Sequence, residues 1–243
     1  FVEVLKNTEE MLSEISVIPV ENSIEGTVGQ SIDALTESKL RVMAEKYLKI
    51  EHCLIGTGKL EELDTVYSHP QALGQCSEFI QKNNLKTVPT YDTAGSVKIV
   101  KEMNDVRCAS IASREAGELY DTPIIKENIE NNSNNYTRFL ILASDNAKWE
   151  QVKTKEKMKT SIIFSVKHEP GALYEILKEF NDNDIDLTKI ESRPNKNQNW
   201  EYNFIVDFVG EVKNKQISDV LDNISKKTLF LKILGSYPIA DLD

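Results

Sequence analysis

The hydrophobic pattern divides the chain into two parts with different successions of strands and helices. In the first part, short apolar runs such as 16–20 and 109–112 alternate with segments such as 72–80, where apolar residues recur at helical spacing. Short apolar runs are typical of strands, and recurrence at every third or fourth position is typical of helices. We therefore predict an α/β domain with a largely parallel sheet in this part.

The second part has strand and helix patterns in the order βαββαβ, which is ferredoxin-like. These patterns lie near residues 160–166, 171–182, 186–191, 201–209, 214–225 and 229–235. A polar, lysine-rich stretch at 149–158 separates the two parts and is predicted to be a linker. We expect a first domain at 1–148, with a second lobe at about 59–128, and a second domain at 159–243.

Composition and charge exclude several classes of protein. The formal net charge is −10, whereas nucleic acids and anionic membranes are bound by basic surfaces. The sequence has no apolar run long enough to cross a bilayer. We therefore expect a protein of the cytoplasm that binds neither nucleic acid nor membrane.

The cysteines and histidines give no sign of a metal site. Cys53, Cys76 and Cys108 are widely spaced and form no CxxC motif, so we predict buried, reduced thiols. Reduced thiols fit a cytoplasmic location. The three histidines lie far apart, without the spacing of metal ligands, and we expect no metal.

Polar clusters lie where predicted strands give way to helices or loops. They contain Glu21, Asn22, Ser23, Ser68, Gln75, Asp92, Thr93, Ala94, Ser96 and Thr137. Ligands of α/β domains bind at such strand ends, and small residues at a helix start let an anion approach the backbone N–H groups. Helix capping explains several of these residues equally well, and Ser68 is expected to cap the helix that begins near Pro70.

Arg138 stands at the head of a predicted apolar strand, where a cation needs a partner. A carboxylate is the natural bidentate partner of a guanidinium group. The carboxylate can belong to a substrate or to the protein itself, and the sequence leaves both alternatives open.

Taken together and in this order, the clusters resemble the prephenate dehydratases, and two motifs of the second part resemble the regulatory ACT domain of that family. The matching segments are PVENSIEG at 19–26, YSHPQAL at 67–73, DTA at 92–94, TRF at 137–139, GAL at 171–173 and ESRP at 191–194. The family also opens with a segment of the form GPxGTxS, which is absent here. We therefore expect that an N-terminal segment is missing from this sequence.

The resemblance implies a two-lobed catalytic domain with the fold of periplasmic binding proteins, followed by an ACT domain. It also implies a carbon-oxygen lyase, a hydro-lyase that converts prephenate to phenylpyruvate, CO2 and water in phenylalanine biosynthesis. Formation of the aromatic ring drives this reaction. No cofactor or metal is therefore required.

The resemblance assigns roles to residues of the first domain. Thr137 would hydrogen-bond the leaving hydroxyl, and that bond would strengthen as the C–O bond breaks. Glu21 is the alternative acid if it is buried, and Arg138 would hold the pyruvyl carboxylate. The other expected catalytic and substrate-binding residues are Asn22, Gln75, Ser23, Ser68, Thr93, Ala94, Ser96 and Phe139.

The ACT resemblance implies feedback inhibition by phenylalanine, bound between paired ACT domains of a homodimer or homotetramer. The expected effector-binding residues are Gly171, Ala172, Leu173, Glu191, Ser192, Arg193 and Pro194. Arg193 can instead be a loop arginine without a role in binding. Two other classes stay open, a non-catalytic protein that clamps a small anion and a regulatory module whose catalytic half has decayed.

Overall fold

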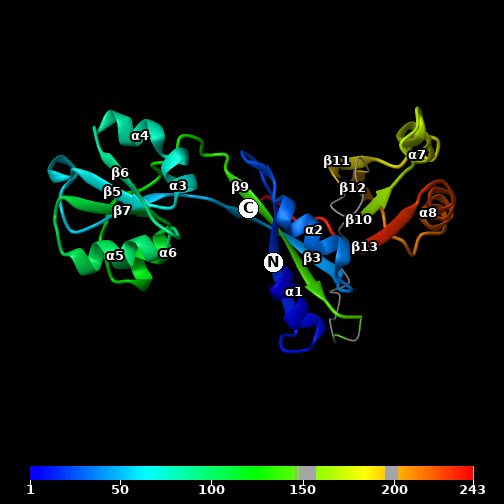
Figure 1. Cartoon of the computed structure of the whole chain (residues 1–243), viewed down its shortest axis with the longest axis horizontal. Coiled ribbons are helices and arrows are strands. Elements are labelled where there is room, and N and C mark those ends of the chain that lie inside the picture. Colours follow the sequence, from blue (N-terminus) through cyan, green and yellow to red (C-terminus); the bar gives the residue numbers. More distant parts are fainter. Residues whose placement is uncertain (146, 148–156, 195–201, 243) are drawn as a thin grey trace. The chain divides into compact units, whose positions relative to one another are not determined.

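The computed structural model describes residues 1–145, 147, 157–194 and 202–242. The chain forms two compact units, each with its own hydrophobic core (Figure 1). Unit 1 comprises Phe1–Leu48 and Thr137–Asp243, and unit 2 comprises Lys49–Tyr136. Most of the predicted linker, at 149–156, lies outside the described residues.

Unit 1 contains two layers, of which the first is a four-stranded sheet with two helices. The strand order is β2-β1-β9-β3. The elements are α1 (Val2–Glu9), β1 (Ile15–Asn22), β2 (Gly26–Thr27), α2 (Gly29–Glu37), β3 (Arg41–Lys49) and β9 (Tyr136–Ala143). In β1, burial alternates with period two and includes Ile18, Val20 and Asn22. A register shift between Pro19 and Glu21 then pairs Asn22 with Thr137, on the face of the sheet opposite Ile18 and Arg138.

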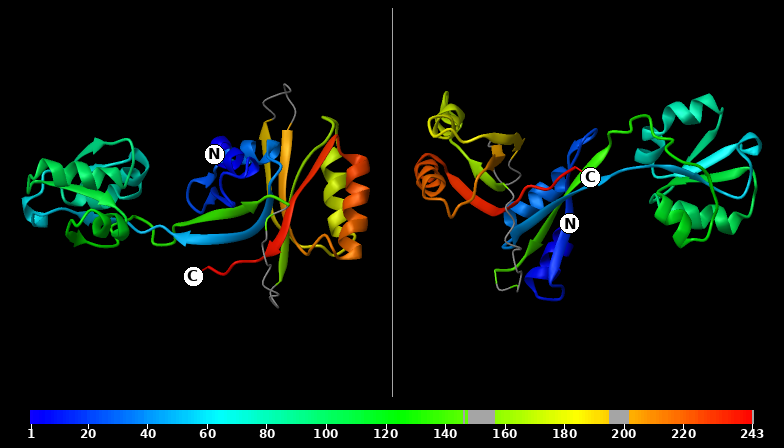
Figure 2. Two further views of the ribbon diagram at one scale, coloured as in Figure 1. Left: turned by 90° about the horizontal axis from the view of Figure 1, so that it is seen from below. Right: turned by 180° about the vertical axis from the view of Figure 1, so that it is seen from behind.

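The second layer of unit 1 is a four-stranded antiparallel sheet in the order β11-β12-β10-β13. Its elements are β10 (Met158–Ser165), α7 (Ala172–Asn181), β11 (Leu187–Pro194), β12 (Tyr202–Val209), α8 (Lys215–Lys227) and β13 (Phe230–Pro238). Helices α7 and α8 cover one face of this sheet (Figure 2). The βαββαβ order agrees with the hydrophobic pattern.

A shared hydrophobic core joins the two layers of unit 1. Ile18, Leu35 and Leu140 of the first layer are buried together with Ile205 and Tyr237 of the second. Burying apolar surface is the main favourable contribution to packing. The face of the second sheet opposite α7 and α8 is therefore covered by the first layer.

Unit 2 is built around a five-stranded sheet in the order β6-β5-β7-β4-β8. Its elements are β4 (Cys53–Ile55), η1 (Leu60–Glu62), β5 (Thr65–Ser68), α3 (Pro70–Gln75), α4 (Ser77–Lys82), β6 (Lys86–Pro89), α5 (Gly95–Met103), β7 (Cys108–Ala112), α6 (Arg114–Leu119) and β8 (Ile124–Lys126). Strands β6, β5 and β7 are parallel, whereas β4 runs antiparallel to β7 and β8.

The prediction of a largely parallel sheet is thus right for three strands of unit 2 and wrong for the first layer of unit 1. There, β9 returns from unit 2 and runs antiparallel to β1. The hydrophobic pattern identifies a strand but does not encode its direction. Helix α1 was also not predicted, because its mixed sequence buries little more than Leu5 and Thr8.

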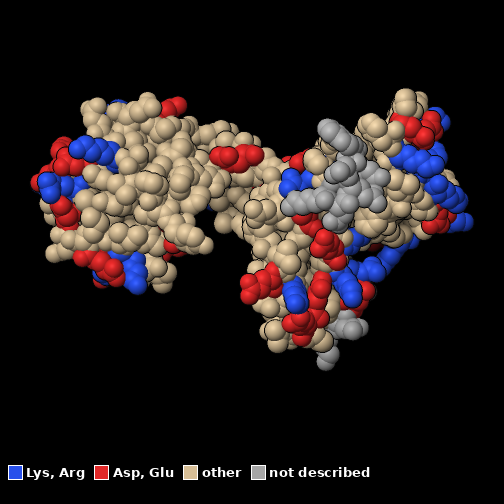
Figure 3. Space-filling model, in the orientation of Figure 1, with Lys and Arg blue, Asp and Glu red and all other residues tan. Residues whose placement is uncertain are grey.

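The described residues contain no helix that is long and apolar enough to span a membrane. Cys53, Cys76 and Cys108 are buried free thiols, as predicted, and burial raises the pKa of Cys76 to about 12. On the face shown in Figure 3, basic and acidic side chains lie side by side on both units.

Candidate active site

Asn22 and Thr137 face each other at the ends of two neighbouring strands. They are register partners in the β1–β9 ladder, and Asn22 Nδ2 donates a hydrogen bond of 3.1 Å to Thr137 Oγ1. Asn22 Oδ1 accepts from the backbone N–H groups of Ile24, at 3.0 Å, and Glu25, at 2.9 Å. These two bonds fix the amide orientation, so its NH2 group points to Thr137. Because an amide NH2 group can only donate, the Thr137 oxygen accepts and its own proton stays available for another acceptor.

The TRF motif is split between the two faces of β9. Thr137 and Phe139 are half-buried on one face, and Arg138 is buried on the other. This follows from the period of two in a strand. Thr137 therefore shares its face with a half-buried aromatic ring, and Arg138 points into the interior of unit 1.

Arg138 is 5% exposed, and all three of its guanidinium nitrogens bond protein oxygens. Nε donates to Glu45 Oε2 at 2.7 Å, Nη1 to Asp207 Oδ2 at 2.6 Å and Nη2 to Tyr237 Oη at 2.9 Å. Burial by itself lowers the pKa of Arg138, but the neighbouring Asp207 and Glu45 more than offset this, so the pKa is raised. Of the two alternatives for this arginine, the structure shows the internal salt bridge. A contact between Arg138 and substrate is therefore not part of the function proposed below.

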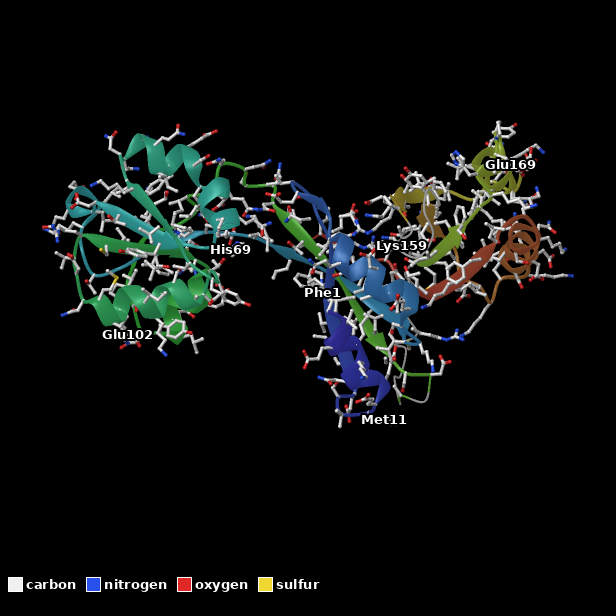
Figure 4. All side chains as sticks on the ribbon, in the orientation of Figure 1. Phe1, Met11, His69, Glu102, Lys159 and Glu169 are labelled. Atoms are coloured by element: carbon white, nitrogen blue, oxygen red, sulfur yellow. The ribbon has the colours of Figure 1, made fainter. Side chains whose placement is uncertain are left out.

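The partners of Arg138 belong to a larger buried network between the two layers. Lys159, labelled in Figure 4, lies 2.8 Å from Glu45 through its Nζ atom. Ser161 Oγ donates to Asp207 Oδ1 at 2.5 Å and lies 2.5 Å from the Tyr237 hydroxyl. Buried charges are tolerated when they are paired and hydrogen-bonded in this way.

Glu21 lies on the same side of the sheet as Arg138, and its side chain is 37% exposed. Its carboxylate lies 2.8 Å from Lys189 Nζ and 3.6 Å from Arg138 Nη1. The burial that the role of alternative acid requires is not found. The structure instead shows Glu21 as an ion-pair partner of two cations.

In unit 2, the predicted residues Ser68, Thr93 and Ser96 gather where β5 and β7 end and α5 begins. The buried Ser68 hydroxyl donates to the carbonyl of Ile111 at 2.6 Å. Ser96 is also buried, and its hydroxyl lies 2.6 Å from the carbonyl of Thr93. Thr93 is half-buried, and Ala94 beside it is exposed. Ser68 and Ser96 therefore brace the strand ends, whereas Thr93 and Ala94 remain accessible.

Two details of unit 2 differ from the sequence analysis. The residue that caps α3 is His69, whose ring accepts a hydrogen bond from the N–H of Gln71, so the prediction of a Ser68 cap was wrong. The sequence also indicated no partner for Gln75, whose Oε1 accepts a 2.8 Å hydrogen bond from Nε2 of the buried His52. His52 thereby fixes the Gln75 amide and leaves its NH2 group to donate elsewhere.

A cavity of about 160 Å³ opens beside the start of α7 in the second layer. Its lining includes Val166, Glu169, Ala172, Leu173 and Phe204. Figure 4 labels Glu169 in the turn that precedes α7. The turn closes with Gly171 at φ 86°, a conformation that favours glycine. Two of the predicted effector residues, Ala172 and Leu173, therefore line this cavity.

Comparison with known proteins matches the sequence to two families. The prephenate dehydratase family matches residues 1–147, and the ACT domain family matches residues 160–225. A prephenate dehydratase of Methanocaldococcus jannaschii is 41% identical over 93% of this chain and 82% of its own length.

The chain belongs to the prephenate dehydratase family.

Solved structures agree with this membership. A prephenate dehydratase of Arthrobacter aurescens in complex with L-Phe has a TM-score of 0.86 and 26% identity, covering 98% of this chain and 79% of that chain. GqqA, a quorum-quenching acylase, has a TM-score of 0.87 and 27% identity, covering 99% of this chain and 87% of that chain. Since one fold can support different activities, the residues of the site must decide the chemistry.

Sequence reasoning missed the residues that hold the two layers of this prephenate dehydratase family member together. Asp207 stands alone within the apolar strand sequence FIVDFV, and Glu45 stands within RVMAEKY. A lone charge inside an apolar strand, as at Asp207, signals a buried pair, whereas Glu45 stands beside Lys46 and gives no such signal. The sequence does not show that Arg138 is the partner of these two carboxylates. Asp207 lies 69 residues from Arg138 in the chain, and Glu45 lies 93 residues from it.

Proposed function

We propose that this chain catalyses the decarboxylative dehydration of prephenate to phenylpyruvate in the cytoplasm, as a hydro-lyase of phenylalanine biosynthesis. Membership of the prephenate dehydratase family supports the reaction. The hydrogen-bonded pair of Asn22 and Thr137 is the observation that carries it, because it prepares a neutral donor at a strand end.

In this mechanism, Thr137 donates a hydrogen bond to the ring hydroxyl of prephenate. As the ring carboxylate leaves as CO2, the electrons of its C–C bond enter the ring and the hydroxide departs with the electrons of the C–O bond. Negative charge grows on the departing oxygen, so the bond from Thr137 strengthens in the transition state. Asn22 holds the Thr137 oxygen and so aims the proton. The departing hydroxide becomes water with a proton from the solvent.

A neutral donor suits this reaction better than a nearby cation. The ring carboxylate must lose its charge as CO2 forms, and a tight ion pair would stabilise the charge that has to disappear. Sequestering Arg138 among Glu45 and Asp207 keeps that cation from Thr137's face of the sheet. Within unit 2, Gln75, Thr93 and Ala94 keep the catalytic and substrate-binding roles that the resemblance implies, with Ser68 and Ser96 as supports of that region.

The ACT domain is proposed to bind L-phenylalanine in the cavity at the start of α7. Val166, Leu173 and Phe204 supply an apolar lining for the phenyl ring, and Glu169 supplies a carboxylate for the ammonium group. The turn at Gly171 presents backbone groups for the carboxylate. The relative of known structure with bound L-Phe supports this effector. We further propose that the chain works as a homodimer or homotetramer, in keeping with the ACT resemblance.

The decisive experiment mixes the purified chain with prephenate and follows phenylpyruvate by its enolate absorbance in alkali. Formation of phenylpyruvate, reduced by added L-phenylalanine, is the expected result. Binding of prephenate without turnover would instead support the anion-clamping alternative. L-phenylalanine binding without any response to prephenate would support the decayed regulatory module.

A further inference from the structure

Strand β11, which carries the ESRP motif, has two faces with different neighbours. Its register with β12 pairs Ser192 with Phe204, and Phe204 lines the effector cavity. The same register pairs Glu191 with Ile205, which lies in the core shared with the first layer. Strand β11 is the outer strand of its sheet, beside β12, which carries Phe204. Residues at odd numbers, Lys189, Glu191 and Arg193, therefore face the first layer.

Arg193 is fitted to the start of α2 in the first layer. Its Nε lies 2.7 Å from Asp33 Oδ1 and its Nη2 lies 3.0 Å from Asp33 Oδ2, which is a bidentate pair. Gly29, the first residue of α2, lies directly beneath the guanidinium group. A Cβ atom at Gly29 would clash with Arg193 Nη1, so the missing side chain leaves room for the arginine. Arg193 therefore lies in strand β11 rather than in a loop, and its guanidinium group is paired within the protein.

Lys189 and Glu191 hold the hairpin that carries Asn22. Lys189 Nζ lies 2.8 Å from Glu21 Oε1 and 3.2 Å from Thr27 Oγ1, and Thr27 also donates to the carboxylate of Glu191. Glu21 and Thr27 are register partners in the β1–β2 hairpin. Asn22 follows Glu21 and bonds Thr137. The ACT strand thus touches both sides of the turn on which the proposed chemistry depends.

We propose that Lys189, Glu191 and Arg193 are positioning residues for the Asn22–Thr137 pair, and that β11 transmits the effector signal to them. This inference rests on the function proposed above. A ligand in the cavity that shifts β11 through Phe204 and Ser192 moves the opposite face of the same strand. Such a shift would break the ion pairs that Arg193 and Lys189 form with the first layer, because short hydrogen-bonded ion pairs do not stretch far. The β1–β2 hairpin would then have two arrangements, one with these ion pairs and one without them. Half of the ESRP motif therefore serves the catalytic layer, and the other half faces the effector.

The test uses Asp33→Asn in the full chain, because Asp33 belongs to the first layer and does not line the effector cavity. Prephenate turnover is measured with and without L-phenylalanine, and binding of L-phenylalanine is measured by calorimetry. Allosteric coupling is typically about 5–150-fold, and we expect the variant to lose most of its inhibition factor while it still binds L-phenylalanine. Glu127→Gln is the matched control. It removes a carboxylate from Arg114 in unit 2 and should keep the inhibition of the parent chain.

Gly29→Ala is the second variant, since it displaces the Arg193 guanidinium without removing either charge. It should reproduce the loss of inhibition seen with Asp33→Asn. Lys189→Met should lower kcat per folded molecule more than it raises KM. The folded fraction is measured by circular dichroism, because loss of folded protein alone also lowers the apparent kcat at constant KM. Lys189→Arg should rescue kcat in part, because it restores the cation beside Glu21.

Two results would overturn this inference. Parent-like inhibition in both Asp33→Asn and Gly29→Ala would show that the contact transmits nothing. Loss of L-phenylalanine binding in Arg193→Lys, with intact inhibition in Asp33→Asn, would show that Arg193 is an effector ligand. A failure of the proposed function looks different, because the parent chain itself would then form no phenylpyruvate.

Discussion

The two faces of strand β9 carry neighbouring residues with opposite properties. On one face, Thr137 is half-buried and uncharged, and its one described partner is the amide of Asn22. On the other, Arg138 is buried among two carboxylates and a phenol. The Thr137 hydroxyl can therefore still donate a hydrogen bond, whereas the guanidinium nitrogens of Arg138 donate to groups of the protein.

Within the TRF motif, Thr137 is therefore suited to the proposed reaction, and Arg138 to holding the two layers of unit 1 together. The reaction needs a hydroxyl that can follow growing negative charge, which a half-exposed residue can provide. The junction of the two layers needs charges that are fully satisfied, since a buried charge without a partner is costly. Neighbouring positions on a strand are suited to such a division because they face opposite sides.

The largest effect on stability is expected for Arg138→Met. Removing the cation leaves Asp207 and Glu45 buried with fewer partners, which costs about 3–5 kcal/mol. Urea denaturation of the full chain measures this loss. Arg114→Met is the control, because its pair with Glu127 is exposed and should cost no more than about 1 kcal/mol. Equal losses in the two variants would contradict a structural role for the Arg138 network.

Thr137→Ala tests the other face of the same strand. Loss of one donor to a developing oxyanion lowers kcat by about 10²–10³-fold, whereas stability should change by less than about 1 kcal/mol. Thr137→Ser keeps the hydroxyl and should keep most of the activity. Near-normal kcat in the alanine variant would remove Thr137 from the mechanism.

The sequence predicts these elements better than it predicts their partners. The amphipathic patterns of α7 and α8 and the apolar strands around them reproduce the βαββαβ order, because burial on one face is a local property. Strand alternation also implies that Thr137 and Arg138 face opposite sides. The pairing of Arg138 with Asp207 depends on how two sheets pack, and no local pattern carries that information.

The same reasoning explains the errors in unit 2. Serine is a common helix cap, yet Ser68, two residues before Pro70, is turned inward to the carbonyl of Ile111, and His69 caps the helix. The choice depends on the neighbouring strand β7, which is 43 residues away from Ser68. Gln75 was found as a candidate, but its partner His52 carries no signal in the sequence.

Asn22→Asp probes the direction of the hydrogen bond in the proposed site. Both oxygens of aspartate accept, so the backbone bonds from Ile24 and Glu25 survive and the turn is preserved. Thr137 must then donate to residue 22, which withdraws its proton from the substrate. We expect kcat per folded molecule to fall by about 10–100-fold. The denaturation midpoint should also fall, because Asn22 is buried and a new buried charge is costly. Unchanged kcat would show that the Thr137 proton is not directed by Asn22.

The smallest effect is expected at the surface of the first layer, where Glu9 offers a contrast to the buried charges around Arg138. Glu9 Oε1 accepts hydrogen bonds from the Ser38 hydroxyl at 2.6 Å and from the N–H of Lys39 at 2.7 Å. The bond from Ser38 is the main reason that the pKa of Glu9 lies below its ordinary value of 4.5. A carboxyl group with a lowered pKa in the folded state stabilises that state above its ordinary pKa, and this contribution is lost as the pH falls through the lowered value. Glu9→Gln should therefore cost no more than about 1 kcal/mol at pH 7, because solvent screens this group, and the difference from the parent chain should shrink below pH 4.5. Denaturation of the variant and the parent chain at pH 7 and below pH 4.5 measures this difference in stability. A difference that grows on acidification would contradict the stabilising role of the Glu9 carboxylate.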